Sequence, residues 1–318
     1  MPKGRPHGGR PFGIPESPPA WDRCRIMRIA ITGSSGLIGT ALSSSLRAGG
    51  HDVLRLVRRP TAAADEITWD PANGTIDTAR LEGVDAVVNL AGAGLGDRRW
   101  NAAYKREILT SRTAATHTIA RAVAEARVPV LVSGSAIGFY GDTGDRAVTE
   151  ADGNGSGFLA DVVVAWEAAA GPARDGGTRV VLARTGLVAT REGGAFGRML
   201  PLFRLGLGGR LGSGRQYWSL ISLRDEVRAL EHCITSDVEG PVNCTAPSPG
   251  TNAAFTSVLA RALHRPALLP VPAFALRAVV GEFAGDILGS QRVEPARLLA
   301  SGFRFEHADV SAIAATLR

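Results

Sequence analysis

The sequence predicts an α/β fold, in which a doubly wound parallel sheet is joined to a smaller, mostly helical C-terminal lobe. Three observations support this fold class. Short apolar runs alternate with helix-length segments from residue 27 onward, a glycine-rich turn follows the first apolar run, and the alternation stops near residue 189. Strands that are separated by helical crossovers run parallel, and helices then cover both faces of the sheet.

The first part of the chain supplies the strands and helices of this sheet. Short continuous apolar runs indicate buried strands, and longer segments with apolar residues on one face indicate helices. The segment 101–127, for example, places Ile108, Ile119 and Val123 on one face and charged residues opposite. In chain order, we expect strands at 27–32, 51–58, 67–69, 85–90, 128–133 and 179–188, and helices at 36–50, 101–127 and 158–173.

Beyond residue 189 the composition changes. Glycines crowd the interval 193–214, and prolines recur from Pro247 to Pro272. We expect residues 190–318 to form a substrate lobe that interleaves with a dinucleotide-binding domain at residues 27–189. Short helices are expected at 252–263, 273–283 and 295–300, and strands at 217–222 and 242–244.

Composition and charge exclude several classes of protein. The 318 residues are 45% hydrophobic and 21% charged, which is typical of a globular chain with a full core. Residues 1–26 carry five basic and two acidic residues, half of the formal net charge of +6. We expect this segment to be a disordered tail, or the product of an upstream start codon ahead of Met27. The remainder lacks basic runs interleaved with aromatic residues, so no nucleic-acid partner is expected.

Cysteine, histidine and hydropathy patterns bear on location and metal chemistry. Cys24, Cys233 and Cys244 have neither metal-binding nor redox spacing, which favours a reducing compartment, and we expect a cytoplasmic protein. The six histidines show no paired metal-ligand spacing, so no metal is expected. The most apolar late stretch, residues 267–288, contains prolines and charges, so no membrane partner is expected.

A glycine-rich turn predicts a dinucleotide site of the Rossmann type. Gly33, Gly36 and Gly39 follow the first strand directly and open the first helix. We expect Gly33 to allow the tight turn, Gly36 to let the backbone approach a pyrophosphate, and Gly39 to let the helix pack on the strand. The phosphates would then lie on the free N–H groups at the helix N-terminus. A glycine turn without a ligand is the alternative.

The end of the second strand indicates which dinucleotide binds. NAD-binding proteins place Asp or Glu there to bond the ribose diol, whereas this chain has Arg58 followed by Arg59. Arg58 can clamp a 2′-phosphate with two hydrogen bonds, and Ser34 or Ser35 can add donors. The predicted cofactor is therefore NADP(H). In the alternative, both arginines are solvated charges at a strand end.

Several segments match a known family when they are taken together. They include MRIAITGSSGLIG, DAVVNLAG, SGSAIGFYGD and the segments 199–221 and 289–303. From residue 27 to about 317 the chain resembles the extended short-chain dehydrogenase/reductases, in particular their atypical epimerase family branch with its own C-terminal domain. The resemblance implies a Rossmann domain that binds NADP and a C-terminal lobe that closes over a substrate. It implies cofactor contacts from Gly33, Ser34, Ser35, Gly36, Leu37, Ile38, Val57, Arg58, Leu90, Ala91, Gly92, Glu107, Arg112 and Val188.

Two of these groups also have other interpretations. The small residues at 90–92 follow the fourth strand and would let the adenosine ribose lie against the backbone, although an ordinary exit from a strand looks the same. Glu107 and Arg112 lie five positions apart on the long helix, and a surface ion pair is the alternative for either of them.

The catalytic residues depart from the family pattern. Typical members use a Ser after the fifth strand and a Tyr and Lys four residues apart on the next helix, where the Tyr moves a proton and the Lys lowers its pKa. Ser135 stands where the Ser is expected, but the Tyr and Lys positions hold Leu159 and Val163. Ser135 and the nearby phenol Tyr140 are therefore the catalytic candidates. In the alternative, Tyr140 packs a loop that Ser135 caps.

Two carboxylates on the helix 158–173, Asp161 and Glu167, are expected to be solvated rather than catalytic. In the C-terminal lobe, polar and aromatic residues of glycine-rich loops or strand ends could grip an anionic or sugar-like substrate, with Trp218 stacking on a sugar or base. These candidates are Arg204, Arg210, Arg215, Gln216, Trp218 and Asn243.

Two functions follow from these residues. The first is a cytoplasmic NADP(H)-dependent oxidoreductase or epimerase that acts on a carbonyl or sugar-like small molecule, with Ser135 and Tyr140 polarising the substrate. The second is a sensor or scaffold that binds NADP(H) without turnover, which the missing Tyr and Lys suggest. The sequence leaves the substrate and the oligomeric state open.

Overall fold

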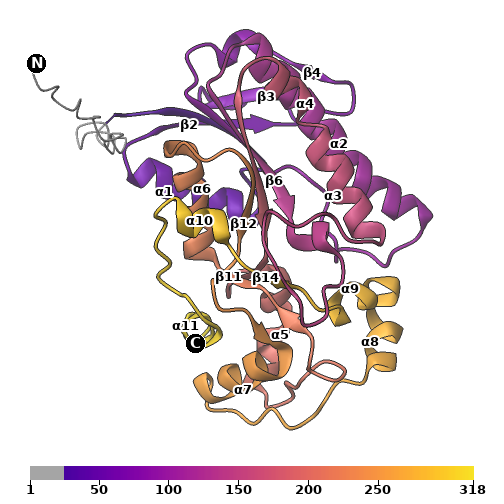
Figure 1. The fold of residues 1–318 in the computed structure, drawn as a ribbon. Coiled ribbons are helices and arrows are strands. Elements are labelled where there is room, and N and C mark those ends of the chain that lie inside the picture. Colours follow the sequence, from indigo (N-terminus) through magenta and orange to yellow (C-terminus); the bar gives the residue numbers. More distant parts are fainter. Residues whose placement is uncertain (1–24) are drawn as a thin grey trace, which may run out of the picture.

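The structure, a computed structural model, describes residues 25–318, so nearly all of the expected N-terminal tail lies outside the described residues. An eight-stranded sheet forms the centre of the upper part of the molecule in Figure 1. Its strand order is β12-β8-β6-β5-β1-β2-β3-β4, and only the pair β3–β4 is antiparallel. The predicted doubly wound α/β fold is thus confirmed. The strands are β1 (Arg28–Thr32), β2 (Asp52–Val57), β3 (Glu66–Asp70), β4 (Thr75–Ile76), β5 (Ala86–Asn89), β6 (Val130–Ala136), β8 (Arg179–Thr185) and β12 (Gly240–Cys244).

Helices cover both faces of this sheet. One face packs against α1 (Leu37–Ala48) and α6 (Leu223–Thr235), and the other against α2 (Ala102–Glu125), α3 (Phe158–Ala168) and α4 (Gly171–Asp175). The alternation within β1 explains this arrangement, since successive side chains of a strand point to opposite faces. Ile29 and Ile31 lie in the core with α1 and α6, whereas Ala30 lies in the core with α2 and α4.

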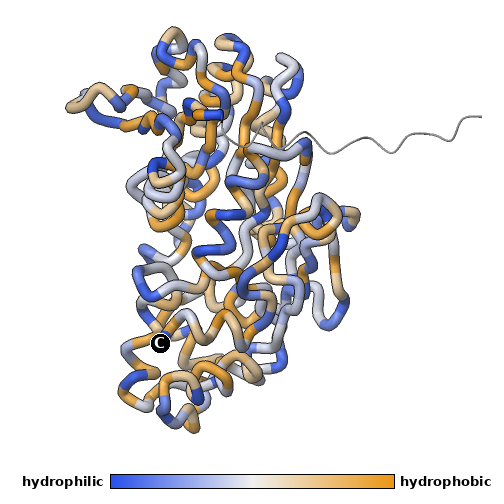
Figure 2. Tube along the Cα trace, turned by 90° about the vertical axis from the view of Figure 1, so that its left-hand side faces the viewer, coloured by the Kyte–Doolittle hydropathy of each residue, from blue (hydrophilic) through white to orange (hydrophobic). Residues whose placement is uncertain are grey.

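The second lobe lies below the sheet in Figures 1 and 2. Its core is aromatic: the ring of Phe196 meets the rings of Phe255 and Trp218 edge-on, with centroids 5.3 and 6.5 Å apart. The helices of this part of the chain are α5 (Gly194–Arg204), α7 (Asn252–Ala262), α8 (Ala273–Val280), α9 (Ala284–Leu288), α10 (Ala296–Ala300) and α11 (Val310–Ala315). Paired short strands are β9 (Leu187–Ala189) with β11 (Leu220–Ser222), β10 (Tyr217–Trp218) with β13 (Gly250–Thr251), and β7 (Ala147–Val148) with β14 (Arg292–Val293).

The two parts interleave through the segment 223–244. α6 packs beside α1, and β12 pairs with β8 as an edge strand of the main sheet. The strand expected at 242–244 within the substrate lobe therefore belongs to the sheet. The expected elements do not include α5 or α6. A glycine pair opens α5, and α6 carries six charged or histidine positions beside the apolar residues Val227, Leu230 and Ile234 that it buries.

Two predicted elements are each divided in two. The expected helix 158–173 breaks after Ala168, and Pro172 then starts α4 in the first turn, where proline is tolerated. The expected strand 179–188 breaks at Gly186. A Cβ at Gly186 would lie 2.5 Å from the Ser219 carbonyl oxygen, so the chain turns there at a close backbone approach.

No helix within residues 25–318 combines the length and the apolar character needed to cross a bilayer. Cys233 and Cys244 are buried free thiols, while Cys24 lies outside the described residues.

Candidate functional site

The glycine turn lies at the carboxyl end of β1, where α1 begins. Gly33 has a φ of +64°, which favours glycine, and a Cβ at this position would lie 2.7 Å from the Leu90 carbonyl oxygen. A Cβ at Gly39 would lie 2.2 Å from the Gly33 carbonyl oxygen, so the helix packs directly on the turn. Gly36 is exposed, and a Cβ there would meet only the Gly33 oxygen, at 3.2 Å. The turn therefore packs against protein backbone at Gly33 and Gly39, and it is exposed to solvent at Gly36, the N-cap of α1.

A buried threonine fixes the neighbouring end of β5. The Thr32 hydroxyl donates to Asn89 Oδ1 at 2.7 Å and accepts from the backbone N–H groups of Leu90 and Ala91 at 3.0 and 3.2 Å. These bonds hold the exit of β5 against the glycine turn. The two strand ends therefore form one rigid edge, from which Leu90, Ala91 and Gly92 continue.

The two arginines after β2 have different surroundings. Arg59 donates two hydrogen bonds to the buried Glu66 carboxylate, at 2.6 and 2.9 Å, and the Ala62 N–H adds a third at 2.7 Å. The Arg59 guanidinium in particular lowers the pKa of Glu66 to about 2. Arg58 is exposed and forms no ion pair or side-chain hydrogen bond with any other residue of 25–318. Arg59 is therefore structural, and Arg58 is available to a ligand.

Arg112 lies against the loop that follows β5. Its guanidinium donates to the carbonyl oxygens of Ala93 and Ile108, at 2.9 and 3.0 Å, and stacks over the Trp166 ring at 5.2 Å. Burial lowers its pKa to about 10, and it makes no ion pair among the described residues. Glu107, by contrast, is exposed and lies 3.5 Å from Arg98. The two residues do not pair with each other, and the surface ion pair considered for Glu107 is present.

The second lobe touches the turn through α5. Backbone at Gly193 and Gly194 approaches the Leu37 side chain, such that a Cβ at either glycine would lie 3.5 Å from it. Val188 in β9 is half-buried and packs with Ile38 against the core beneath α1. The predicted contacts Leu37, Ile38 and Val188 thus surround one end of the turn.

A buried polar network connects the two catalytic candidates. Ser135 donates to Glu167 Oε1 at 2.6 Å, and Arg184 donates to both Glu167 oxygens at 2.7 and 2.8 Å. Arg184 also donates to the Tyr140 hydroxyl at 2.9 Å, and Tyr140 donates to Asn243 Oδ1 at 2.8 Å. Burial opposes the charge of Arg184, but its bonds to Glu167 and Tyr140 outweigh this effect and raise its pKa.

The network changes how Tyr140 and Glu167 are interpreted. Tyr140 is only 3% exposed, its hydroxyl proton is committed to Asn243, and burial raises its pKa. This geometry favours the packing role for Tyr140. The expectation that Glu167 is solvated was wrong, because its carboxylate is largely buried between Ser135 and Arg184, whereas Asp161 is exposed as expected.

Apolar residues occupy the positions of the family's Tyr and Lys. A Cβ at Gly138 would meet Leu159 Cβ at 3.4 Å and Val163 Cγ2 at 3.9 Å. Both side chains therefore pack on the turn that follows β6, η3 (Ile137–Tyr140). No group at either position can exchange a proton.

Three of the substrate candidates have structural roles instead. The stacking role for Trp218 was wrong, because the ring is buried in the aromatic core of the second lobe. Gln216 is buried and donates to the Leu211 carbonyl oxygen at 3.0 Å, and Asn243 is buried between Tyr140 and the Glu294 carbonyl oxygen.

The other three candidates, Arg204, Arg210 and Arg215, are exposed. Arg210 and Arg215 line an open hollow of about 650 Å³ together with Asp145 and Tyr217.

Sequence reasoning missed Glu66 and Arg184 and misplaced Glu167. Glu66 acts on Arg59 from the adjacent strand, and Arg184 and Glu167 act on Ser135 and on each other from distant parts of the chain. Arg184 stands on β8 opposite Ser135 in the register of the sheet, so a correct strand pairing is the signal that would have found it.

The fold and the open glycine turn define a dinucleotide-binding protein of the Rossmann type. Residues 29–244 match the family model described as the NAD dependent epimerase/dehydratase family, and residues 271–317 match a domain of unknown function, DUF1731. The chain therefore belongs to the NAD-dependent epimerase/dehydratase family.

The relatives carry the same broad designation. The chain is 52% identical over 281 residues to the epimerase family protein MT2273 of Mycobacterium tuberculosis, covering 88% of this chain and 93% of that one. It is 43% identical to the epimerase family protein SDR39U1 of Bos taurus, covering 90% and 98%. The crystal structure of human SDR39U1 with NADPH superposes with a TM-score of 0.84 at 37% identity, covering 92% and 99%. A UDP-N-acetylglucosamine 4-epimerase from Bacillus cereus, at 17% identity and a TM-score of 0.73, shares the fold.

Proposed function

We propose that this protein binds NADP(H) and that Arg58 selects it over NAD(H). The observation that carries this proposal is the separation of the two arginines after β2: Glu66 holds Arg59 and leaves Arg58 without a partner among the described residues. An exposed guanidinium at the end of the second strand matches the 2′-phosphate of NADP in charge and geometry. The NADPH named for the human relative supports the same choice.

The rest of the edge fits a dinucleotide. The free N–H groups at the start of α1, capped by the open Gly36, would take the pyrophosphate. The backbone at Leu90 to Gly92 would lie beside the adenosine ribose, and Arg112 would supply positive charge next to Gly92, since a Cβ there would lie 3.3 Å from Arg112 Cγ.

We further propose an oxidoreductase that interconverts a hydroxyl and a carbonyl on a small substrate, in the cytoplasm. The bound cofactor supplies or accepts the hydride. In the oxidation direction, a substrate hydroxyl hands its proton to Ser135 Oγ while Ser135 passes its own proton to Glu167 Oε1, 2.6 Å away. The bidentate bond from Arg184 holds the Glu167 carboxylate in place for this relay. Leu159 and Val163 would exclude water from the turn at Gly138, and Tyr140 would position Arg184.

Calorimetric titration of NADP⁺, NADPH, NAD⁺ and NADH tests the binding step. We expect binding of the NADP pair and much weaker binding of the NAD pair. Equal binding of both pairs, or no binding of either, would contradict the proposal. If NADP(H) binds, a screen of carbonyl substrates for NADPH consumption tests the reaction, and Ser135→Ala and Glu167→Gln should then each lower kcat by about 100-fold or more.

A second function, NADP(H) binding without turnover, is favoured by one specific observation. The positions of the family's proton-transfer residues hold Leu159 and Val163, and both side chains pack on Gly138. Such a protein would read the NADPH/NADP⁺ ratio and present its second lobe to a partner. It would bind both redox forms and consume neither, with Ser135→Ala leaving both affinities unchanged.

A further inference from the structure

Charge is segregated in the second lobe. Residues 193–223 contain Arg198, Arg204, Arg210 and Arg215, and residues 240–281 contain Arg261, Arg265 and Arg277. Neither segment contains Asp, Glu or Lys. All seven arginines are exposed, so the two segments present only positive side-chain charge to the solvent.

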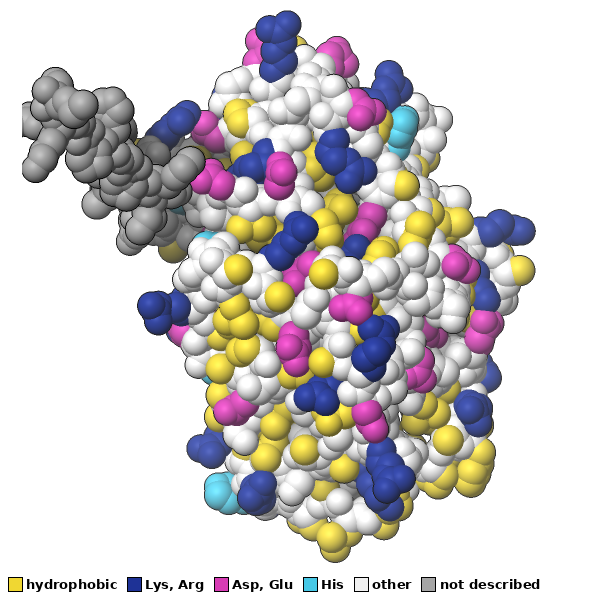
Figure 3. All heavy atoms as spheres, viewed as in Figure 1, with side chains coloured by type: hydrophobic (Ala, Val, Ile, Leu, Met, Phe, Trp, Pro, Cys, Tyr) yellow, Lys and Arg dark blue, Asp and Glu magenta, His cyan; other side chains and the backbone are white. Residues whose placement is uncertain are grey.

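Large apolar side chains are exposed in the same two segments. Leu205 is 72% exposed, Leu268 is 83% exposed and Phe274 is 74% exposed. Leu207, Leu269 and Val279 are exposed as well. The helix α8, with the sequence AFALRAVV, has no buried residue at all. Figure 3 shows hydrophobic side chains along the lower edge of the molecule with Lys and Arg side chains beside them, and the tube at the lower end of Figure 2 mixes orange with blue.

The two segments that carry these residues contact each other. Arg265 Nε donates to the Arg204 carbonyl oxygen at 2.9 Å, and Leu211 forms a parallel bridge with Val271, so the two segments run side by side. Between α7 and the segment 264–270 that follows it lies an open groove of about 920 Å³. We call this surface the basic apolar face. Its members are Arg204, Leu205, Leu207, Arg210, Arg261, Arg265, Leu268, Leu269, Phe274 and Arg277.

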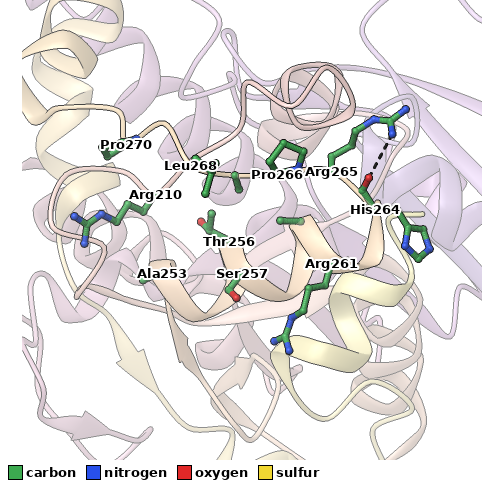
Figure 4. A pocket seen from close by; sticks show the side chains of 12 residues that line it. Arg210, Ala253, Thr256, Ser257, Arg261, His264, Arg265, Pro266, Leu268 and Pro270 are labelled. Atoms are coloured by element: carbon green, nitrogen blue, oxygen red, sulfur yellow. Dashed lines mark hydrogen bonds between the residues drawn. The ribbon is translucent and has the colours of Figure 1, made fainter.

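The arrangement of the arginines indicates a broad surface rather than a pocket for one anion. In Figure 4 the guanidinium groups of Arg210, Arg261 and Arg265 point away from one another around the rim of the groove. Pro266, Leu268 and small residues line the groove between them. A single phosphate would therefore meet one guanidinium at most, whereas a wide array of anions would meet all three.

We propose that the basic apolar face docks on a lipid bilayer surface that carries anionic headgroups. Exposed leucine and phenylalanine side chains enter the headgroup and acyl boundary, and arginines around them meet the lipid phosphates. A second copy of this chain is a poor occupant, because a two-fold interface would set this cationic face against itself. A nucleic acid would match the charge but would leave the aliphatic side chains without apolar contacts.

The expectation of no membrane partner rested on the lack of a spanning segment, and binding at a bilayer surface requires no such segment. Docking on a bilayer is independent of the proposed cofactor, because no member of the basic apolar face belongs to the glycine turn or to the strand ends beside it.

Sedimentation of the full chain with vesicles tests the proposal. We expect binding to vesicles of phosphatidylcholine with phosphatidylglycerol, little binding to phosphatidylcholine alone, and weaker binding at high salt. The double variant Leu268→Ser, Phe274→Ser should bind at least about tenfold more weakly. Leu299→Ser is the matched control, since Leu299 is a half-exposed leucine on α10 outside this face.

Thermal unfolding of both variants verifies that they fold like the parent chain. The proposal is overturned if the parent chain binds neither kind of vesicle, or binds both equally. It is also overturned if the double variant binds as well as the parent, which would assign vesicle binding to another part of the chain, such as the basic segment 1–26. Binding to polyuridylate RNA without binding to vesicles would identify a nucleic acid as the partner.

Discussion

At the scale of single residues, the buried carboxylate of Glu66 pairs with Arg59 and leaves the neighbouring Arg58 unpaired among the described residues. Glu66 in β3 takes both hydrogen bonds from Arg59 and remains ionised, with a pKa of about 2. Arg58, one position earlier, has neither an ion pair nor a side-chain hydrogen bond among residues 25–318. A residue on the adjacent strand thus engages Arg59 and leaves Arg58 free for the 2′-phosphate contact that we propose.

Arg58→Ala should weaken NADP⁺ binding and leave NAD⁺ binding nearly unchanged. A lost charge-assisted pair with the 2′-phosphate costs about 2 kcal/mol, or about 30-fold in Kd. Titration of both nucleotides into the variant measures this. Arg59→Ala serves as the comparison, and it should lower stability without changing the preference between the two cofactors. Equal losses for both nucleotides with Arg58→Ala would assign Arg58 to general phosphate binding.

Tyr140→Phe should act on stability rather than on chemistry. The variant leaves Arg184 Nη1 and Asn243 Oδ1 without a buried partner, which costs about 1–3 kcal/mol and lowers Tm by several degrees. Tyr217→Phe is the control, because the Tyr217 hydroxyl has no hydrogen bond to other described residues. An unchanged Tm together with a large loss of kcat would identify Tyr140 as a catalytic residue instead.

At the scale of elements, the glycines of the turn have separate functions and should respond differently to alanine. Gly39→Ala would force α1 away from β1, because the new Cβ would lie 2.2 Å from a carbonyl oxygen, so we expect loss of folded protein. Gly36→Ala adds a methyl group at the open side and should keep the fold while weakening all four dinucleotides. Gly153→Ala, where a Cβ meets nothing within 4 Å, is the neutral control. Cofactor binding by folded Gly39→Ala would disprove this division of roles.

Elements with local signals could be predicted from the sequence. The strands β1, β5 and β6 contain short apolar runs, and β2 contains apolar residues on either side of Arg55; each strand lies within a few residues of its expected place. The helix α6 also has local signals, a Ser222 cap and buried apolar residues at helical spacing, and its omission from the expected elements was wrong. The place of β12 in the sheet could not be predicted, because it depends on pairing with β8, which lies far away in the chain. Glu167 was likewise expected to be solvated, because its partner Ser135 lies 32 positions away in the chain.

At the scale of the whole molecule, stability should depend on one buried acid. Glu226 in α6 is fully buried; its Oε1 accepts from Thr185 at 2.7 Å, and its Oε2 has no hydrogen bond among the described residues. Burial raises its pKa from 4.5 to about 7. The folded protein therefore holds this proton at pH values where the unfolded chain releases it.

The free energy of unfolding should fall as the pH rises from about 4.5 to about 7, by up to about 3 kcal/mol from this group. Glu226→Gln should remove this decrease and make the protein more stable than its parent at pH 8. Urea unfolding at pH 5 and pH 8 measures both effects, with the exposed Glu82→Gln as the control. An equal decrease in Glu226→Gln and its parent would assign the pH dependence to other groups.

The interleaved sheet also affects how the chain is made. A ribosome completes β8 about 55 residues before it reaches β12, an interval of several seconds at about 5–20 residues per second. Throughout that interval the outer edge of β8 has no strand beside it, and such an edge pairs readily with other chains. The nascent protein therefore exposes the unpaired edge of β8 while much of its second lobe is being translated. Binding of chaperones to the nascent chain should end only after Cys244, the last residue of β12, emerges from the ribosome.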